Sequence, residues 1–175
     1  MEIIDKNNNK AIFLDRDGVI NKQLIGDYVK NIGEFEILPK VKDALIEFKK
    51  MGYLLIVVTN QQGIAKGIMT EDDLKVVHNY MLKRLPEIDD IYYCPHLEGT
   101  CNCRKPKNGM LLKAKEKWNI DFAKSWMIGD SESDIICGRS SGCKTIRILH
   151  DNEESYADFT AKNLYECVGI IGAHI

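Results

Sequence analysis

The chain has 175 residues, of which 45% are hydrophobic and 29% are charged, and its net charge is −2. This composition indicates a globular protein and excludes disordered, collagen-like and low-complexity classes. The small negative charge offers no basic field for nucleic acid. No apolar run approaches the roughly 20 residues that cross a bilayer, and the polar residues 1–9 lack a signal-peptide core. We expect one cytoplasmic domain over residues 1–175, a monomer without nucleic-acid or membrane partners.

Hydrophobic spacing predicts alternating strands and helices along the chain. In chain order we expect a strand at 11–14, a helix from 41 to Gly52, a strand at 54–58, a helix at 70–85, a strand at 91–93, a helix at 110–118, a strand at 126–128, a helix at 134–141, a strand at 145–148 and a closing helix from 164. This alternation predicts an α/β fold, with a Rossmann-like parallel sheet covered by helices on both faces.

Polar residues follow the predicted strands, at the sheet edge where α/β proteins bind ligands. They are Asp15-Arg16-Asp17-Gly18, Thr59-Asn60-Gln61, Arg104-Lys105, and Gly129-Asp130 with Asp134. Two carboxylates 4 Å apart repel by about 4 kcal/mol at an effective dielectric constant of 20, so such a cluster requires a cation. Oxygen ligands suit Mg²⁺, which commonly also binds phosphate, and Lys105 can neutralise further phosphate charge.

Each of these motifs also has an ordinary structural explanation. Asp15 and Asp17 could form a solvated turn, Thr59 and Asn60 suit the end of a strand, and Asp134 could be an acid in the first turn of a helix. Their joint occurrence in this order favours a functional site.

The cysteines fall into two groups. Cys94, His96, Cys101 and Cys103 supply three thiolates and an imidazole, the ligands of a closed, structural Zn²⁺ site in a loop inserted at 94–103. A reduced, metal-free cysteine-rich loop is the alternative. Cys137, Cys143 and Cys167 lie among apolar residues and are expected in the core. His78, His150 and His174 have no recognisable partners, and we interpret His78 as part of a helix.

The four strand-end motifs resemble those of the haloacid dehalogenase (HAD) phosphatase superfamily, and the match extends from about Ala11 to Ile148. Residues 59–67, 92–96, 101–106 and 109–112 are more specifically similar to the heptose bisphosphate 7-phosphatases and to their relatives, the histidinol-phosphate phosphatases. The resemblance implies a HAD fold with a minimal cap, because the intervals from Asp17 to Thr59 and from Thr59 to Lys105 are short.

The resemblance also implies roles for the site residues. Asp15 is the implied nucleophile and Asp17 the acid and base. Mg²⁺ is held by Asp15, the Asp17 backbone carbonyl and Asp130, with Asp134 supporting this site indirectly. The implied contacts to the phosphate and the substrate are Thr59, Asn60, Gln61, Arg104 and Lys105.

We therefore expect a Mg²⁺-dependent phosphatase that uses an aspartyl-phosphate to remove the 7-phosphate of a heptose 1,7-bisphosphate. Histidinol phosphate is the alternative substrate. An alternative of another class is a phospho-accepting receiver domain, which also combines acids, a hydroxyl, a lysine and Mg²⁺ on a parallel sheet. A receiver places its acceptor later in the chain and has no use for a zinc loop.

Overall fold

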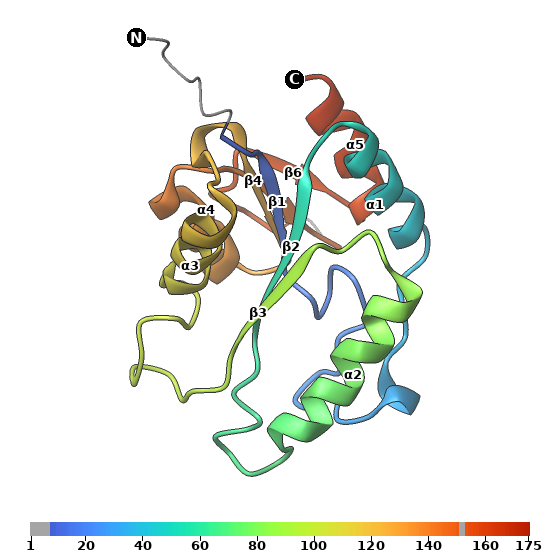
Figure 1. The fold of residues 1–175 in the computed structure, drawn as a ribbon, viewed down its shortest axis with the longest axis vertical. Coiled ribbons are helices and arrows are strands. Elements are labelled where there is room, and N and C mark those ends of the chain that lie inside the picture. The colour runs from blue at the N-terminus through green and yellow to red at the C-terminus, as the bar shows by residue number, and fades with distance from the viewer. Residues whose placement is uncertain (1–7, 151–152) are drawn as a thin grey trace, which may run out of the picture.

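The computed structural model of the protein describes residues 8–150 and 153–175. Within these ranges, six parallel strands form one sheet in the order β3-β2-β1-β4-β5-β6 (Figure 1). The strands are β1 (Ala11–Leu14), β2 (Leu54–Asn60), β3 (Asp90–Cys94), β4 (Trp126–Gly129), β5 (Lys144–Ile148) and β6 (Phe159–Ala161). The central strand β1 lies between β2 and β4, so all three end at the same edge of the sheet.

Helices cover both faces of this sheet. They are α1 (Val41–Lys50), α2 (Glu71–Arg84), α3 (Gly109–Trp118), α4 (Glu132–Ser141) and α5 (Leu164–Gly172), with short 3₁₀ turns at Ile32–Glu34 and Phe122–Lys124. Figure 1 shows α1 and α5 on one side of the sheet, α3 and α4 on the other, and α2 toward the end where the strands finish. No helix of the described residues is both long and apolar enough to cross a membrane.

The central strand shows why the apolar run at 11–14 is continuous. Side chains alternate between the two faces of a strand. Ile12 and Leu14 join the core beneath α1 and α5, whereas Ala11 and Phe13 join the core beneath α3 and α4. All four are fully buried. A parallel strand covered by helices on both sides needs apolar residues at every position.

The predicted α/β architecture is confirmed, with two corrections. The expectation of five strands missed β6, a three-residue edge strand that pairs with β5 and is too short to show a hydrophobic period. The expected helix at 134–141 begins two residues earlier, at Glu132, because Ser131 and Asp134 form a capping box. The minimal cap is also confirmed, since the segment between β2 and β3 contains only α2.

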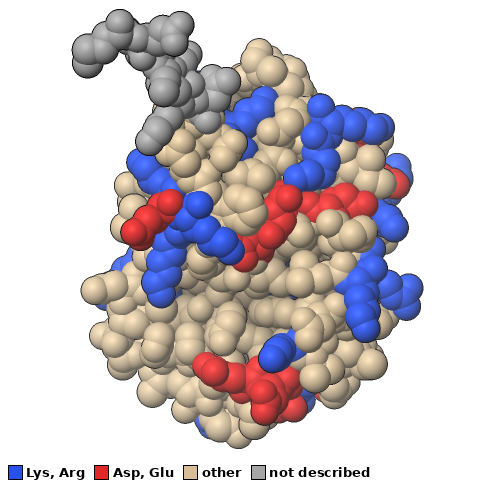
Figure 2. Space-filling view, in the orientation of Figure 1, with Lys and Arg blue, Asp and Glu red and all other residues tan. Residues whose placement is uncertain are grey.

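The surface carries charges of both signs. Figure 2 shows acidic and basic side chains interspersed on one face of the molecule, with uncharged surface between them. This face therefore presents no continuous basic area of the kind that binds a nucleic-acid backbone.

The difference in burial between two leucines predicts that they contribute unequally to the free energy of unfolding. Leu55 in β2 is fully buried, whereas Leu112 in α3 is half exposed. We expect Leu55→Ala to lower the free energy of unfolding by about 2–5 kcal/mol, because it leaves a cavity in a close-packed core. Leu112→Ala is the matched control and should change this energy by no more than about 0.5 kcal/mol. Urea unfolding measures both, and equal losses in the two variants would contradict the assigned core.

Candidate active site

A cavity of about 180 Å³ opens at the edge where β1, β2 and β4 end. Six residues that the sequence marks as candidates line it: Asp15, Asp17, Asn60, Lys105, Asp130 and Asp134. Three other candidates, Thr59, Gln61 and Arg104, are not among its described lining residues. Six further lining residues were not predicted: Gln23, Leu24, Asp27, Tyr28, Ser131 and Ser133.

Two glycines of the predicted motifs allow the acidic residues to approach one another. Gly18 has φ of +88°, and a Cβ there would lie only 2.0 Å from Oδ2 of Asp130. A Cβ on Gly129 would lie 2.2 Å from Cβ of Asp134. A side chain at either position would push apart the segments that carry the carboxylates.

Asp15, Asp130 and Asp134 form one acidic cluster, with an oxygen of each within 4.8 Å of the others. Lys105 lies among them, and its Nζ is 2.7 Å from Oδ1 of Asp15 and 2.6 Å from Oδ1 of Asp134. Asp134 is thus in direct contact with this lysine and as much part of the cluster as the other two carboxylates. One ammonium group faces three carboxylates, so negative charge is in excess.

This excess charge changes the acidity of the cluster. Burial and the neighbouring Asp134 raise the pKa of Asp15 well above its usual value, although Lys105 partly opposes this. Burial and Asp134 also raise the pKa of Asp130 to about 6. Close, buried oxygen ligands with uncompensated charge fit a hard divalent cation such as Mg²⁺. The residues present therefore suit the metal that the sequence predicts.

Asp17 lines the same cavity, but three donors hold its side chain. Arg16 Nη2 and Asn21 Nδ2 donate to its Oδ1 at 3.0 and 2.9 Å, and Gln61 Nε2 donates to its Oδ2 at 3.0 Å. Burial alone would raise the pKa of Asp17, but the Arg16 charge and these hydrogen bonds lower it below its usual value. Asp17 is therefore ionised at neutral pH in the free protein.

His78 has a partner that the sequence analysis missed. Arg16 is completely buried, and its Nη1 lies 3.1 Å from Nε2 of His78 in α2. Burial and the Arg16 charge lower the pKa of His78 to about 3, so the ring is neutral and its Nε2 accepts the hydrogen bond. The available signal was the helical spacing of Leu74, Val77, His78 and Met81, which places His78 on the buried face of α2.

Hydrogen bonds connect the candidates at the end of β2 with Lys105 and Asp17. Asn60 and Lys105 form two hydrogen bonds, since Asn60 Nδ2 donates to the Lys105 carbonyl and the Lys105 backbone N–H donates to Asn60 Oδ1, both at 3.1 Å. Gln61 Nε2 also donates to Thr59 Oγ1 at 2.8 Å. Thr59 and Gln61 are buried. In this structure Asn60 therefore positions Lys105, and Gln61 positions Asp17.

The predicted cysteine and histidine ligands form a second cluster. Sγ of Cys94, Cys101 and Cys103 and Nδ1 of His96 all lie within 4.8 Å of one another. The shorter Sγ–Sγ and Sγ–Nδ1 distances within this cluster are 3.1–3.5 Å. None of the three cysteines forms a disulfide. Tetrahedral Zn²⁺ separates sulfur ligands by about 3.8 Å, so a displacement of a few tenths of an ångström would accommodate the ion. The donor set fits a four-ligand metal site.

The pKa values of the thiols do not divide along the two groups of cysteines, because burial also raises the pKa of Cys94 in the cluster to about 12. The pKa of Cys101 is lowered to about 6, because hydrogen bonds to its sulfur, the first of them from the Arg104 backbone N–H, outweigh the effect of burial. Burial raises the pKa values of Cys137, Cys143 and Cys167 to about 12. These three are buried free thiols, as expected for core residues.

Comparisons with known proteins agree with this fold and site. A HAD-hydrolase-like family model matches residues 102–166. The D-glycero-alpha-D-manno-heptose-1,7-bisphosphate 7-phosphatase of Campylobacter jejuni is 45% identical over 163 residues, covering 90% of this chain and 92% of that protein. The D-glycero-beta-D-manno-heptose-1,7-bisphosphate 7-phosphatase of Haemophilus influenzae is 48% identical over 74% of this chain and 76% of that protein.

A solved structure extends the comparison to three dimensions. The D,D-heptose 1,7-bisphosphate phosphatase of B. bronchiseptica, in complex with magnesium and phosphate, superposes with a TM-score of 0.84 at 26% identity. The match covers 95% of this chain and 99% of that chain.

Fold, acidic cluster and relatives together define a HAD-like phosphatase. The chain belongs to the D-glycero-D-manno-heptose-1,7-bisphosphate 7-phosphatase family. The receiver-domain alternative is therefore set aside.

The neutral, buried state of His78 predicts a pH dependence of stability. Below its ordinary pKa of 6.5 the unfolded chain binds a proton at His78, whereas the folded protein does so only near pH 3. Unfolding therefore becomes more favourable as the pH falls. In His78→Gln the amide oxygen can still accept from Arg16 but does not titrate. We expect the wild type to lose about 1 kcal/mol per pH unit more than this variant between about pH 6 and 4.

Urea unfolding of both proteins across this range measures the difference. Carboxylates that titrate in the same range affect both proteins equally and cancel. Parallel stability curves would show that His78 is charged in the folded protein.

Proposed function

We propose that the protein removes the 7-phosphate from D-glycero-D-manno-heptose 1,7-bisphosphate, with Mg²⁺ and through an aspartyl-phosphate on Asp15. The observation that carries this proposal is the contact of Asp15, Asp134 and Lys105 beside Asp130, in a chain that shares 45% identity with a heptose bisphosphate phosphatase. The proposed substrate is a small sugar bisphosphate, which enters through the cavity at the strand ends.

Asp15 is placed for nucleophilic attack. One carboxylate oxygen attacks the phosphorus, and the bond between phosphorus and the sugar oxygen breaks, leaving the phosphoryl group on Asp15. The Lys105 ammonium is 2.7 Å from Oδ1 of Asp15 and favours its ionised form, against the raising effect of burial on its pKa. The same ammonium can hold an oxygen of the transferring phosphoryl group.

Asp17 acts as the general acid and then as the general base in the proposed reaction. It protonates the departing sugar oxygen, then takes a proton from the water that hydrolyses the aspartyl-phosphate. Asp17 is ionised in the free protein, so it must take up a proton from solvent when the substrate binds. A phosphate dianion entering the cavity raises the pKa of Asp17, because like charges disfavour ionisation.

The metal assignments follow the same residues. Asp15, the backbone carbonyl of Asp17 and Asp130 would hold Mg²⁺, with Asp134 beside them. The ion would neutralise the carboxylates and polarise phosphoryl oxygens. Thr59, Gln61 and Asn60 support Asp17 and Lys105 through the hydrogen bonds described above. Arg104 stays a predicted substrate contact.

Asp15→Asn tests the nucleophile. We expect turnover of the heptose bisphosphate to fall by a factor on the order of 10⁴ or more, because an amide cannot form the covalent intermediate. Asp72→Asn, at an exposed position in α2, is the matched control and should be fully active. Phosphate release measures both, and circular dichroism verifies the fold. Substantial activity of Asp15→Asn, or activity of the wild type after Mg²⁺ chelation, would contradict the mechanism.

The preference between the two candidate substrates is tested by comparing their kcat/KM values. We expect kcat/KM for the heptose bisphosphate to exceed that for histidinol phosphate by about 10² or more, since a pocket discriminates through the groups it hydrogen-bonds. Both the alpha and the beta anomer should be assayed, because the relatives named above differ in this respect. A preference for histidinol phosphate would redirect the assignment to that substrate and leave the catalytic residues unchanged.

We also propose that Cys94, His96, Cys101 and Cys103 bind a structural zinc ion. Elemental analysis should find one zinc per chain in the wild type and none in Cys103→Ala, which should also lose activity because Lys105 lies two residues further on. Cys167→Ala removes a buried thiol outside the cluster and should retain the zinc. Zinc-free wild-type protein with normal stability would refute the site.

A further inference from the structure

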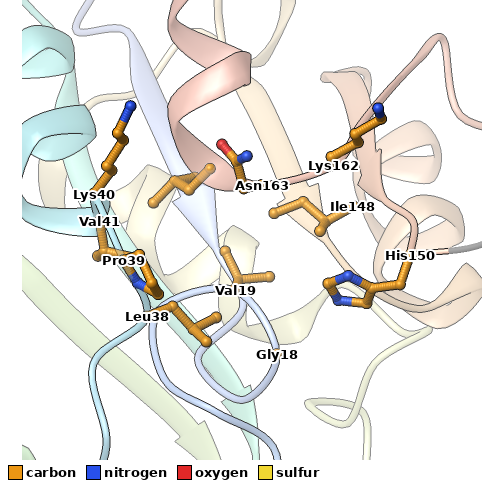
Figure 3. A pocket seen from close by; sticks show the side chains of 11 residues that line it. Gly18, Val19, Leu38, Pro39, Lys40, Val41, Ile148, His150, Lys162 and Asn163 are labelled. Carbon is orange, nitrogen blue, oxygen red and sulfur yellow. The ribbon is translucent and has the colours of Figure 1, made fainter.

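A second cavity, of about 370 Å³, lies beside the segment that follows β1, between the beginnings of α1 and α5 (Figure 3). It shares no lining residue with the active-site cavity. Its volume is within the range of about 300–1,000 Å³ that is usual for small-molecule sites.

The walls of this cavity are apolar and built into the core. Val19, Val41, Ile148 and Leu164 line it, and each is no more than 3% exposed. They come from four separate segments and belong to the core cluster beneath α1 and α5. The cavity is therefore preformed, and an apolar body entering it would meet fixed side chains.

Two lysines carry the charge at this cavity. Lys40 and Lys162 line it, and none of the described lining residues is acidic. The described residues provide no carboxylate within 4 Å of either ammonium group. The nearest acidic contact is with the backbone of Lys162, whose N–H donates to Glu166 Oε2 at 2.8 Å, so both ammonium groups are left without a direct ion pair among the described residues.

The two lysines flank the cavity. In Figure 3, Lys40 and Lys162 lie on opposite sides, with Asn163 between them. Lys40 lies just before α1, and its Nζ is 5.1 Å from the ring centre of Tyr165 in α5. Its side chain therefore extends from α1 to α5 along the cavity rim.

We propose that this cavity binds a small amphipathic organic anion. Its apolar body would contact Val19, Val41 and Leu164, and its acidic group would lie between Lys40 and Lys162. Such a ligand would also touch Gly18, which lines the cavity and directly adjoins Asp130 of the acidic cluster. The site is thus in contact with the loop that carries Asp15 and Asp17, and it is independent of the substrate proposed above.

The fluorescent anion 8-anilinonaphthalene-1-sulfonate is a suitable probe, and uncharged N-phenyl-1-naphthylamine is its matched control. We expect the sulfonate to bind the wild type with one-to-one stoichiometry. The double variant Lys40→Gln/Lys162→Gln should weaken its binding about tenfold, since two positive charges that attract the sulfonate are lost. Binding of the uncharged probe should not change. Lys10→Gln/Lys144→Gln, which removes two lysines beside another depression near Trp126, should bind the sulfonate normally.

Methyl NMR of the wild type locates the probe without any substitution. The sulfonate should shift the methyl resonances of Val19, Val41 and Leu164, while that of Leu24 in the active-site cavity stays unchanged. Shifts confined to other methyl groups, or equal sulfonate affinity in the wild type and in the folded Lys40→Gln/Lys162→Gln variant, would overturn the proposal. Phosphate release by that variant verifies its fold, because neither lysine lines the active-site cavity.

Discussion

The Lys105 ammonium group is the charge on which the acidic site depends. It is buried and contacts Asp15 and Asp134 at 2.7 and 2.6 Å. Burial alone would lower the pKa of Lys105, but Asp134 and Asp15 raise it above its usual value, so the group stays charged. Without this charge, three carboxylates would face one another in a region of low dielectric constant, at a cost of several kcal/mol. Because one cation cannot balance three anions, the cluster still favours a divalent ion.

Two parts of the fold hold this lysine in place. The Asn60 side chain at the end of β2 binds both the N–H and the C=O of Lys105, and the Val58 carbonyl accepts a hydrogen bond from its ammonium group. On the other side, Cys103 belongs to the cysteine and histidine cluster. This cluster is therefore connected to the active site through the backbone, although its ligands do not line the cavity. A metal bound there would restrict the segment that carries Lys105.

The sequence alone predicted those features that depend on residues close together in the chain. Continuous apolar runs such as 11–14 identified the buried strands, and the rule that parallel strands end at one edge located Asp15, Asn60 and Asp130. Contacts between distant segments were not predictable in this way. The Arg16–His78 hydrogen bond joins residues 62 positions apart, and the helical spacing that puts His78 on the buried face of α2 does not identify Arg16 as its partner. The loop that brings Asp27 and Tyr28 to the cavity has no hydrophobic period that would predict its path.

The same distant contact explains how Asp17 is held. A neutral His78 accepts one hydrogen bond from Arg16 without cancelling its charge, so the guanidinium group acts on Asp17 at full strength. Gln61 fixes the other carboxylate oxygen and is itself bonded to Thr59 at the end of β2. These contacts orient Asp17 but favour its ionised form. In the proposed mechanism, the negative charge of the incoming phosphate must offset this preference. Asp17 therefore becomes an effective acid only when the substrate is present, whereas the free protein keeps it as an oriented carboxylate.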